Sequence, residues 1–273
     1  MPGTDRKLGS RILDLGSRID GRGGGRENIR RFFVPPSSIV GEQVTFPPDQ
    51  ARHLATVLRL HPGDRVTVFD GTGPEHVAEL ETVAPTRAAA RIVETHPGRS
   101  PALHLVLLQG VPKGTKMDGI VRMGTEVGVT EFIPFISART VAAGRGRVTR
   151  WQRIAEEAAK QCRRSDVPVV HAPVPLLEAL DRVAGYDLVL LLWEDEQSRT
   201  IGQALAATTP SRRIAVAIGP EGGFAPEEVA QAAARGAVPV TVGPLILRTE
   251  TSGIVALAMA VYELILRPAR DPS

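Results

Sequence analysis

The chain has 273 residues, of which 42% are hydrophobic, 23% charged and 4% aromatic, a composition typical of a globular protein with one large or two smaller domains. The single cysteine, Cys162, excludes an intramolecular disulfide framework, and the formal net charge of +3 does not by itself establish a nucleic-acid partner. We recognise no secretory signal and expect no apolar run long enough to span a bilayer, which favours a cytoplasmic protein with no membrane partner.

Residues 1–29 are rich in arginine and glycine, with the run Gly21–Arg26 near their end. A segment of this composition cannot bury enough apolar surface to offset the entropy lost on ordering. We therefore predict a flexible extension, either a basic arm that touches RNA or a dispensable tail.

Short strand patterns separated by turn signals follow from Arg30 to about Thr95. A helix interrupts them, with Asp49 as its expected cap. Five strands and one helix in this length predict a small β-barrel domain over residues 30–96. The predicted strands are Arg31–Val34, Gln43–Phe46, Arg65–Phe69, His76–Val83 and Ala88–Glu94.

After a linker at His96–Pro101 the hydrophobic pattern changes to strands alternating with amphipathic helices. This alternation over residues 101–268 predicts an α/β domain whose parallel sheet is covered on both faces. The predicted strands are Leu103–Gln109, Glu131–Ile136, Val167–Val170, Asp187–Trp193, Arg213–Ile218 and Val238–Val242.

Several local signals fix the expected helices of this domain. Gly128 is expected to end the helix that begins near Met117, and Thr149 with Gln152 forms the pattern of a capping box. Cys162 falls on the apolar stripe of the Thr149 helix, where a buried small hydrophobic residue is expected. The last helix is expected from Ile254 to Leu266, either sandwiched in the core or at a subunit interface.

Polar and glycine-rich loops follow the last three predicted strands, where parallel sheets bind their ligands. Gly219–Gly223 matches neither a Walker A loop nor a dinucleotide fingerprint, and Glu221 would repel a pyrophosphate. The loop suits an uncharged or cationic ligand approached closely by the backbone, and a pair of tight turns is an equal interpretation. No histidine pair has metal-ligand spacing, so we expect no metal.

Taken together, these residues resemble the bacterial 16S ribosomal RNA (uracil-N3)-methyltransferases of the SPOUT superfamily. The resemblance implies a PUA-like β-barrel followed by a parallel-sheet SPOUT domain with a deep trefoil knot. It also implies S-adenosyl-L-methionine as cofactor, 16S rRNA of the small ribosomal subunit as substrate, no metal, and a homodimer. The matching stretches are Arg30–Val34, His53–Arg59, Lys116–Val129, Ala158–Arg164, Ile218–Gly223 and Leu247–Thr251.

The resemblance also carries roles onto residues of this chain. Glu250 is the candidate general base that takes the uracil N3 proton, and Arg248 the candidate that stabilises charge on the uracil oxygens. An equal interpretation is that Arg248 and Glu250 pair simply to pin the loop. The implied cofactor contacts are Leu192, Trp193, Gly219, Pro220, Glu221, Gly222, Val242, Leu245, Leu247, Thr249 and Thr251. The expected RNA contacts are Arg31, Arg52, His53, Arg59, Arg163 and Arg164.

Three other functions compete with this one. A ribose 2′-O-methyltransferase on the same fold would differ in the position of the methyl group. A nicotinamide-dependent oxidoreductase would need a glycine fingerprint after its first strand, and Gly110–Gly114 is not one. A non-catalytic RNA-binding module would bind no S-adenosylmethionine.

Overall fold

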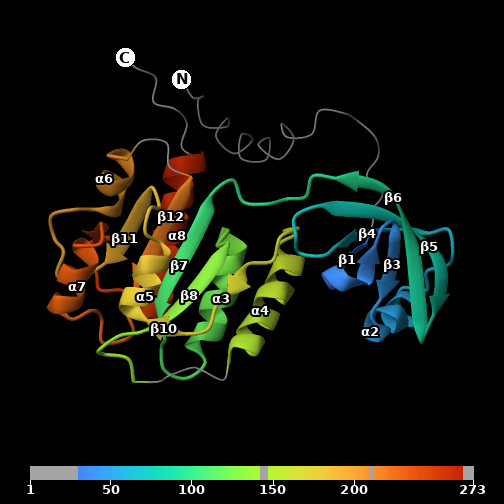
Figure 1. The fold of residues 1–273 in the computed structure, drawn as a ribbon, viewed down its shortest axis with the longest axis horizontal. Helices are drawn as coiled ribbons and strands as arrows, with labels where there is room; N and C mark the ends of the chain where they lie inside the picture. Colours follow the sequence, from blue (N-terminus) through green and yellow to red (C-terminus); the bar gives the residue numbers. More distant parts are fainter. Residues whose placement is uncertain (1–29, 142–146, 209–211, 267–273) are drawn as a thin grey trace, which may run out of the picture. The chain divides into compact units, whose positions relative to one another are not determined.

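The computed structural model describes residues 30–141, 147–208 and 212–266 (Figure 1). The predicted flexible extension, residues 1–29, lies outside the described residues. The described chain contains two β-sheets, one antiparallel for the most part and one parallel.

The first sheet has six strands in the order β1-β4-β5-β6-β3-β2, and only β1 and β4 pair in parallel. Alternate side chains enter a core that includes Val44, Phe46, Leu80 and Ala90, as the period-2 patterns predict. The strands are β1 (Arg31–Phe33), β2 (Ile39–Val40), β3 (Gln43–Phe46), β4 (Arg65–Phe69), β5 (Glu75–Ala84) and β6 (Arg87–His96).

The helix of this part, α2 (Pro48–Arg52), runs directly into a π-helical turn, η2 (His53–Val57). The capping prediction for Asp49 is wrong, because Pro47 is the N-cap residue and no side chain caps the helix. Pro48 sits at the first helical position, where a missing N–H costs nothing. A short 3-10 turn, η1 (Pro36–Ser38), precedes β2.

The second sheet is parallel throughout the described residues, with strand order β10-β8-β7-β12-β11-β13 and β9 paired to β8. The predicted parallel sheet is therefore confirmed, with one additional two-residue strand, β10. The strands are β7 (His104–Gly110), β8 (Glu131–Ile136), β9 (Val169–Val170), β10 (Val174–Pro175), β11 (Leu188–Leu192), β12 (Arg213–Ile218) and β13 (Ala237–Val240).

Helices cover both faces of this sheet. Leu105 and Leu107 of β7 pack on one face with α3, α4, α6 and α8, whereas Val106 and Leu108 pack on the other face with α5 and α7. This alternation along one strand explains why β7 reads as a continuous apolar run. The helices are α3 (Lys116–Val127), α4 (Val148–Gln161), α5 (Leu176–Arg182), α6 (Ile201–Ala206), α7 (Pro226–Ala233), α8 (Thr249–Val261) and the π-helical end η3 (Tyr262–Leu266).

Two local predictions about α4 are wrong. The helix begins at Val148 without a side-chain cap, because the Gln152 amide instead bonds Val170 N at 2.9 Å and Pro168 O at 3.1 Å. Cys162 follows the helix as its C-cap and is only half-buried. The Gly128 prediction is confirmed, since α3 ends there with Gly128 at φ 115°.

The last helix begins at Thr249, earlier than the predicted Ile254, so Glu250 lies in its first turn. Figure 1 shows α8 along β7 and β12, and its buried residues include Ala256 and Leu257. Contrary to expectation, the continuous segment Thr249–Leu266 is long and apolar enough to cross a membrane by length and composition, with mean hydropathy 1.4 and 28% burial. The trefoil knot stays a prediction.

Candidate active site

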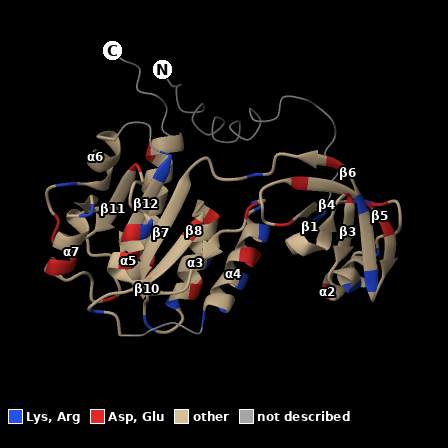
Figure 2. Ribbon diagram, viewed as in Figure 1, with Lys and Arg blue, Asp and Glu red and all other residues tan. Residues whose placement is uncertain are grey.

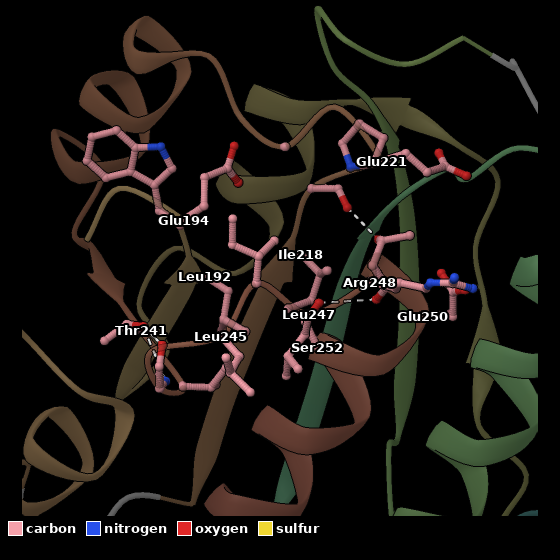
Figure 3. Close-up of a pocket in the computed structure, with 18 of the residues that line it drawn as sticks. Leu192, Glu194, Ile218, Glu221, Thr241, Leu245, Leu247, Arg248, Glu250 and Ser252 are labelled. Carbon is pink, nitrogen blue, oxygen red and sulfur yellow. Dashed lines mark hydrogen bonds between the residues drawn. The ribbon is translucent and has the colours of Figure 1, made fainter. Parts of the chain in front are cut away.

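A cavity of about 500 Å³ opens at the carboxyl ends of β11, β12 and β13, beside the first turn of α8 (Figure 3). Three loops form most of its wall, and each follows one of these strands, as expected for a parallel sheet. Figure 3 shows Arg248, Glu250 and Glu221 at one end of the cavity, with Thr241 and Leu245 at the other. The loop segments are 192–194, 218–223 and 240–250, joined by Lys116 and Ser252.

The loop after β12 is tight because its own backbone atoms are in contact. A Cβ added at Gly219 would lie 2.9 Å from the carbonyl carbon of Gly223, and Gly223 adopts φ +67°. Gly110, at the end of β7, lies against this loop, and a Cβ added to it would lie 2.5 Å from Pro220 N. Only glycine fits at these close approaches, so the glycines shape the cavity floor.

Thr249 ties this loop to the start of α8. Its Oγ1 donates to Gly219 O at 2.6 Å and accepts from Gln109 Nε2 at 3.0 Å. Both side chains are buried, so these hydrogen bonds are protected from water. The Thr249 hydroxyl is thus used in hydrogen bonds within the protein. Only the rest of the residue is available to line the cavity.

The loop after β13 presents apolar side chains to solvent. Leu245 is 75% exposed and Ile246 is 87% exposed, values that are high for large aliphatic residues. Thr241 Oγ1 donates to Gly243 O at 3.0 Å, and Gly243 adopts φ +147°. This local turn leads the chain from the strand into the exposed segment.

Glu221 is held by Lys113 and Lys116, from the loop after β7 and the start of α3. Its carboxylate accepts from Lys113 N at 3.0 and 3.3 Å and from Lys116 Nζ at 2.9 Å. Burial tends to raise the pKa of Glu221, but the hydrogen bonds, led by that from Lys116, outweigh it and lower the pKa. The same hydrogen bond raises the pKa of Lys116.

Glu250 also lies near the Lys116 ammonium, with Oε2 3.6 Å from Nζ. Oε2 is buried and has no hydrogen-bond partner among the described residues. Arg248 is exposed at the N-cap of α8, and the ion pair that the structure gives to Glu250 is with Lys116 rather than with Arg248. A carboxylate at a helix N-terminus is also stabilised by the helix dipole.

The structure brings the two predicted catalytic residues and nearly all predicted cofactor residues into one cavity. Thr251 is the exception, since it is exposed on α8 and does not line the cavity. Sequence reasoning missed Lys116, Glu194, Ile218 and Ser252 as lining residues. Lys116 lay in a stretch that carried the family resemblance, but no spacing rule joins it to Glu221, 105 residues away.

The predicted RNA contacts fall into two groups. Arg52, His53, Arg59 and Arg163 are exposed. Arg31 is half-buried and paired with Glu75.

Arg164 has a structural role instead, because it is buried and its partners lie within the protein. It is only 6% exposed, pairs with Asp166 at 2.6 Å, and donates to the carbonyls of Thr125 and Val129 at 2.9 and 2.7 Å. These bonds, with that from Nε to Asp166 at 3.4 Å, use four of the five guanidinium N–H groups, and the side chain is buried, so we do not retain Arg164 among the RNA contacts.

The cavity combines an apolar wall with charged groups, of which the carboxylates outnumber the cations. Leu192, Ile218 and Leu245 supply the apolar part, and the charged lining residues are Glu194, Glu221, Glu250, Lys116 and Arg248. Trp193 Nε1 is a buried donor without a partner among the described residues. Within the described ranges, no group of three or more His, Cys, Asp or Glu residues could hold a metal ion. The lining suits a ligand with an apolar ring and positive charge.

Comparison with known families matches both parts of the chain. Residues 99–261 match the family described as the RNA methyltransferase domain, and residues 46–93 match the RNA methyltransferase PUA domain. The chain is 36% identical over 231 residues to the ribosomal RNA small subunit methyltransferase E of Synechocystis sp., covering 84% of this chain and 76% of that protein. It is 31% identical over 255 residues to the protein of the same name from Bacillus subtilis, covering 86% and 97%.

A solved structure agrees with these relatives. The ribosomal RNA small subunit methyltransferase E from Neisseria gonorrhoeae, crystallised with S-adenosyl methionine, superposes with a TM-score of 0.74. The two chains are 33% identical, and the match covers 86% of this chain and 98% of the other. The likeness thus extends over both sheets.

Proposed function

Because the chain belongs to the ribosomal RNA small subunit methyltransferase E family of RNA methyltransferases, we propose that it methylates N3 of a uridine in 16S rRNA with S-adenosylmethionine. The observation that carries the proposal is the cavity at the ends of β11, β12 and β13, which gathers the residues implied for cofactor and catalysis. The substrate is the RNA of the small ribosomal subunit.

The cavity lining fits the proposed cofactor. The apolar side chains of Leu192, Ile218 and Leu245 suit an adenine ring, and the backbone of Gly219–Gly222 allows close approach. The carboxylates complement a cation without offering a phosphate site. When bound, the cofactor supplies a methyl group made electrophilic by a positively charged sulfur.

The residues of this chain would then position and activate the uracil. Glu250 would accept the N3 proton, which would free the N3 lone pair for the methyl group that a bound sulfonium cofactor would supply. The exposed guanidinium of Arg248 stabilises negative charge on the uracil oxygens. The proton on Glu250 passes to solvent before the next turnover.

RNA binding involves the basic residues outside the cavity. Arg52, His53 and Arg59 on α2, η2 and the residues after them carry exposed positive charge or donors for phosphates. Arg31 and Arg163 are further candidates. The family matches support a division into a PUA-like barrel at residues 30–96 and a SPOUT domain at residues 101–268. The target uridine would be extruded from its RNA to reach the cavity.

The exposed apolar side chains support a homodimer, and a protein that acts on ribosomal RNA would work in the cytoplasm. Leu245 and Ile246 beside the cavity, and Tyr262 and Leu266 on η3, are each more than half exposed. A second copy that covers them would remove this surface from water. Light scattering at micromolar concentration tests the dimer, which is contradicted by a monomeric mass.

The decisive experiment incubates the protein and labelled S-adenosylmethionine with naked 16S rRNA and, separately, with assembled small subunits. Mass spectrometry of nuclease fragments then locates the methyl group. A methyl on uracil N3 confirms the proposal, and a methyl on a ribose indicates a 2′-O-methyltransferase. No cofactor binding in calorimetry would indicate an RNA-binding module without catalysis.

A further inference from the structure

Lys116 places one ammonium between two carboxylates at the end of the cavity. Nζ lies 2.9 Å from Glu221 Oε1 and 3.6 Å from Glu250 Oε2. The first distance is that of a charge-assisted hydrogen bond, whereas the second is an ion pair too long for one. The three residues come from α3, the loop after β12 and α8, so tertiary structure alone unites them.

Glu221 restrains the Lys116 ammonium through the shorter of its two contacts. The Glu221 carboxylate is itself held, since it accepts both from Lys116 and from the backbone N–H of Lys113. Lys116 therefore cannot move fully toward Glu250 without losing its shorter contact. The result is a positive charge that stabilises Glu250 without taking up one of its lone pairs.

Only part of the Glu250 side chain beside Lys116 is accessible to solvent. Oε2, the oxygen nearest Lys116, is buried, while the Glu250 side chain as a whole is 24% exposed. The exposed surface therefore belongs to the rest of the side chain, which includes Oε1.

We propose that Lys116, restrained by Glu221, is the positioning residue that holds the Glu250 carboxylate in place to take the uracil N3 proton. The inference rests on the proposed function. It gives the Glu221 carboxylate the role of holding Lys116 beside the general base. Other charged groups that line the cavity are Arg248, exposed at the N-cap of α8, and Glu194, exposed after β11, while Asp118 on α3 is paired with Arg150 at 2.7 Å. Asp118 is thereby occupied elsewhere.

The test compares Lys116→Met, Lys116→Arg and Glu221→Gln with the wild-type protein. Single-turnover methyl transfer at saturating cofactor and RNA is measured from pH 5 to 9, and S-adenosylhomocysteine binding is measured by calorimetry. For Lys116→Met we expect about a tenfold to hundredfold slower transfer, the scale of misplacing a reacting group. We also expect the acid limb of the pH–rate profile to move to higher pH, because no cation stabilises the ionised base.

The other variants separate positioning from structure. Lys116→Arg restores most of the rate and the position of the acid limb, since it returns a positive charge. Glu221→Gln gives a smaller loss without moving the acid limb to higher pH, since the Lys116 ammonium remains beside Glu250 and a neighbouring negative charge is removed. The control Arg182→Met, which removes a 2.8 Å ion pair with Glu178 on α5, leaves rate and profile unchanged.

Two results overturn the inference. One is an unchanged acid limb in Lys116→Met, whether or not the rate falls. The other is a loss of S-adenosylhomocysteine affinity equal to the loss of rate, which would make Lys116 a cofactor contact. Failure of the proposed function is distinct, since the wild-type protein would then place no methyl group on uracil N3.

Discussion

Glu250 combines two features that a general base for the uracil N3 proton requires. It lies in the first turn of α8 at the edge of the cavity, and its side chain is partly exposed at 24%. Glu250→Gln keeps the shape and removes the charge, so we expect unchanged S-adenosylhomocysteine affinity. Transfer should slow by about 10²- to 10⁴-fold, the usual contribution of a general base.

Calorimetry and single-turnover transfer measure the two quantities. Glu178→Gln on α5, which removes the acceptor of the Arg182 ion pair, is the matched control. Full transfer by Glu250→Gln would remove the base assignment. Equal losses of affinity and rate would instead place Glu250 against the cofactor.

Asp187 stabilises the start of β12 through hydrogen bonds and does not line the cavity. Its Oδ2 accepts the backbone N–H groups of Arg213 at 2.9 Å and Arg212 at 2.8 Å, at the start of β12. The hydrogen bond from Arg213, followed by that from Arg212, lowers the pKa of Asp187 below the ordinary 3.8. A carboxyl with a lowered folded-state pKa stabilises the protein above 3.8, and this stabilisation is lost as the pH falls through the folded-state pKa.

Asp187→Asn should therefore lower the Tm at pH 7, and the difference from the wild-type protein should shrink below pH 3.8. Thermal unfolding between pH 7 and pH 3 measures this. The exposed Asp195 provides the control, since Asp195→Asn should change the Tm little at any pH. A Tm difference that stays constant across the range would contradict the prediction.

Among the secondary-structure elements, the end of β7 and the loop after β12 are so close together that they leave no room for a side chain at Gly110. A Cβ at Gly110 would lie 2.5 Å from Pro220 N, a backbone atom that cannot move alone. Gly110→Ala should therefore destabilise the protein by about 1–3 kcal/mol, the usual cost of overpacking. It should also displace Gly219–Gly223 and weaken S-adenosylhomocysteine binding.

Gly202 in α6 is the matched control, because a Cβ there would meet nothing within 4 Å. Gly202→Ala should stabilise the protein by about 0.5–1 kcal/mol, since alanine favours the helix. Urea unfolding measures both free energies, and calorimetry measures the affinity. A neutral Gly110→Ala with normal affinity would show that the loop adapts freely.

The elements that could be predicted from the sequence are those with a long buried pattern. β3, β4, β8 and β12 have the predicted bounds, because their alternating or continuous apolar residues report burial directly. β10 has two residues, too few to show a period. The expected Thr149 capping box failed because a tertiary contact competes with the local one, as the Gln152 amide pairs with the chain around β9.

The candidate site shows the same division between local and tertiary information. The two loops Gly219–Gly223 and Val242–Thr251 could be placed from the sequence, because parallel strands bind ligands at their carboxyl ends. The start of α8 was missed because a polar run of Arg248–Ser252 has no apolar period. Lys116 was missed because its partners Glu221 and Glu250 lie on other elements.

Over the described residues of the molecule, Lys and Arg are spread through both parts of the chain with acidic residues between them (Figure 2). RNA binding should therefore depend on local groups rather than on the net charge of +3. Reversing Arg52 and Arg59 to glutamate together should weaken RNA binding and lower the salt dependence of the affinity, since each phosphate contact releases counterions. Cofactor affinity should not change.

Filter binding at several salt concentrations tests this prediction. The double variant Arg182→Glu with Arg235→Glu is matched in charge and removes two surface ion pairs, with Glu178 and Asp181. It should bind RNA as the wild-type protein does. Unchanged RNA affinity in the Arg52 and Arg59 variant would exclude these residues from the RNA interface.

The pairing of β7 with β12 also governs when the enzyme becomes functional during its own synthesis. His104 lies opposite Arg213, so the middle of the parallel sheet stays open until β12 leaves the ribosome. The cavity needs still later residues, up to Ser252. A nascent chain can therefore complete its first sheet early, but it gains a place for the methyl donor only after Ser252 has been synthesised.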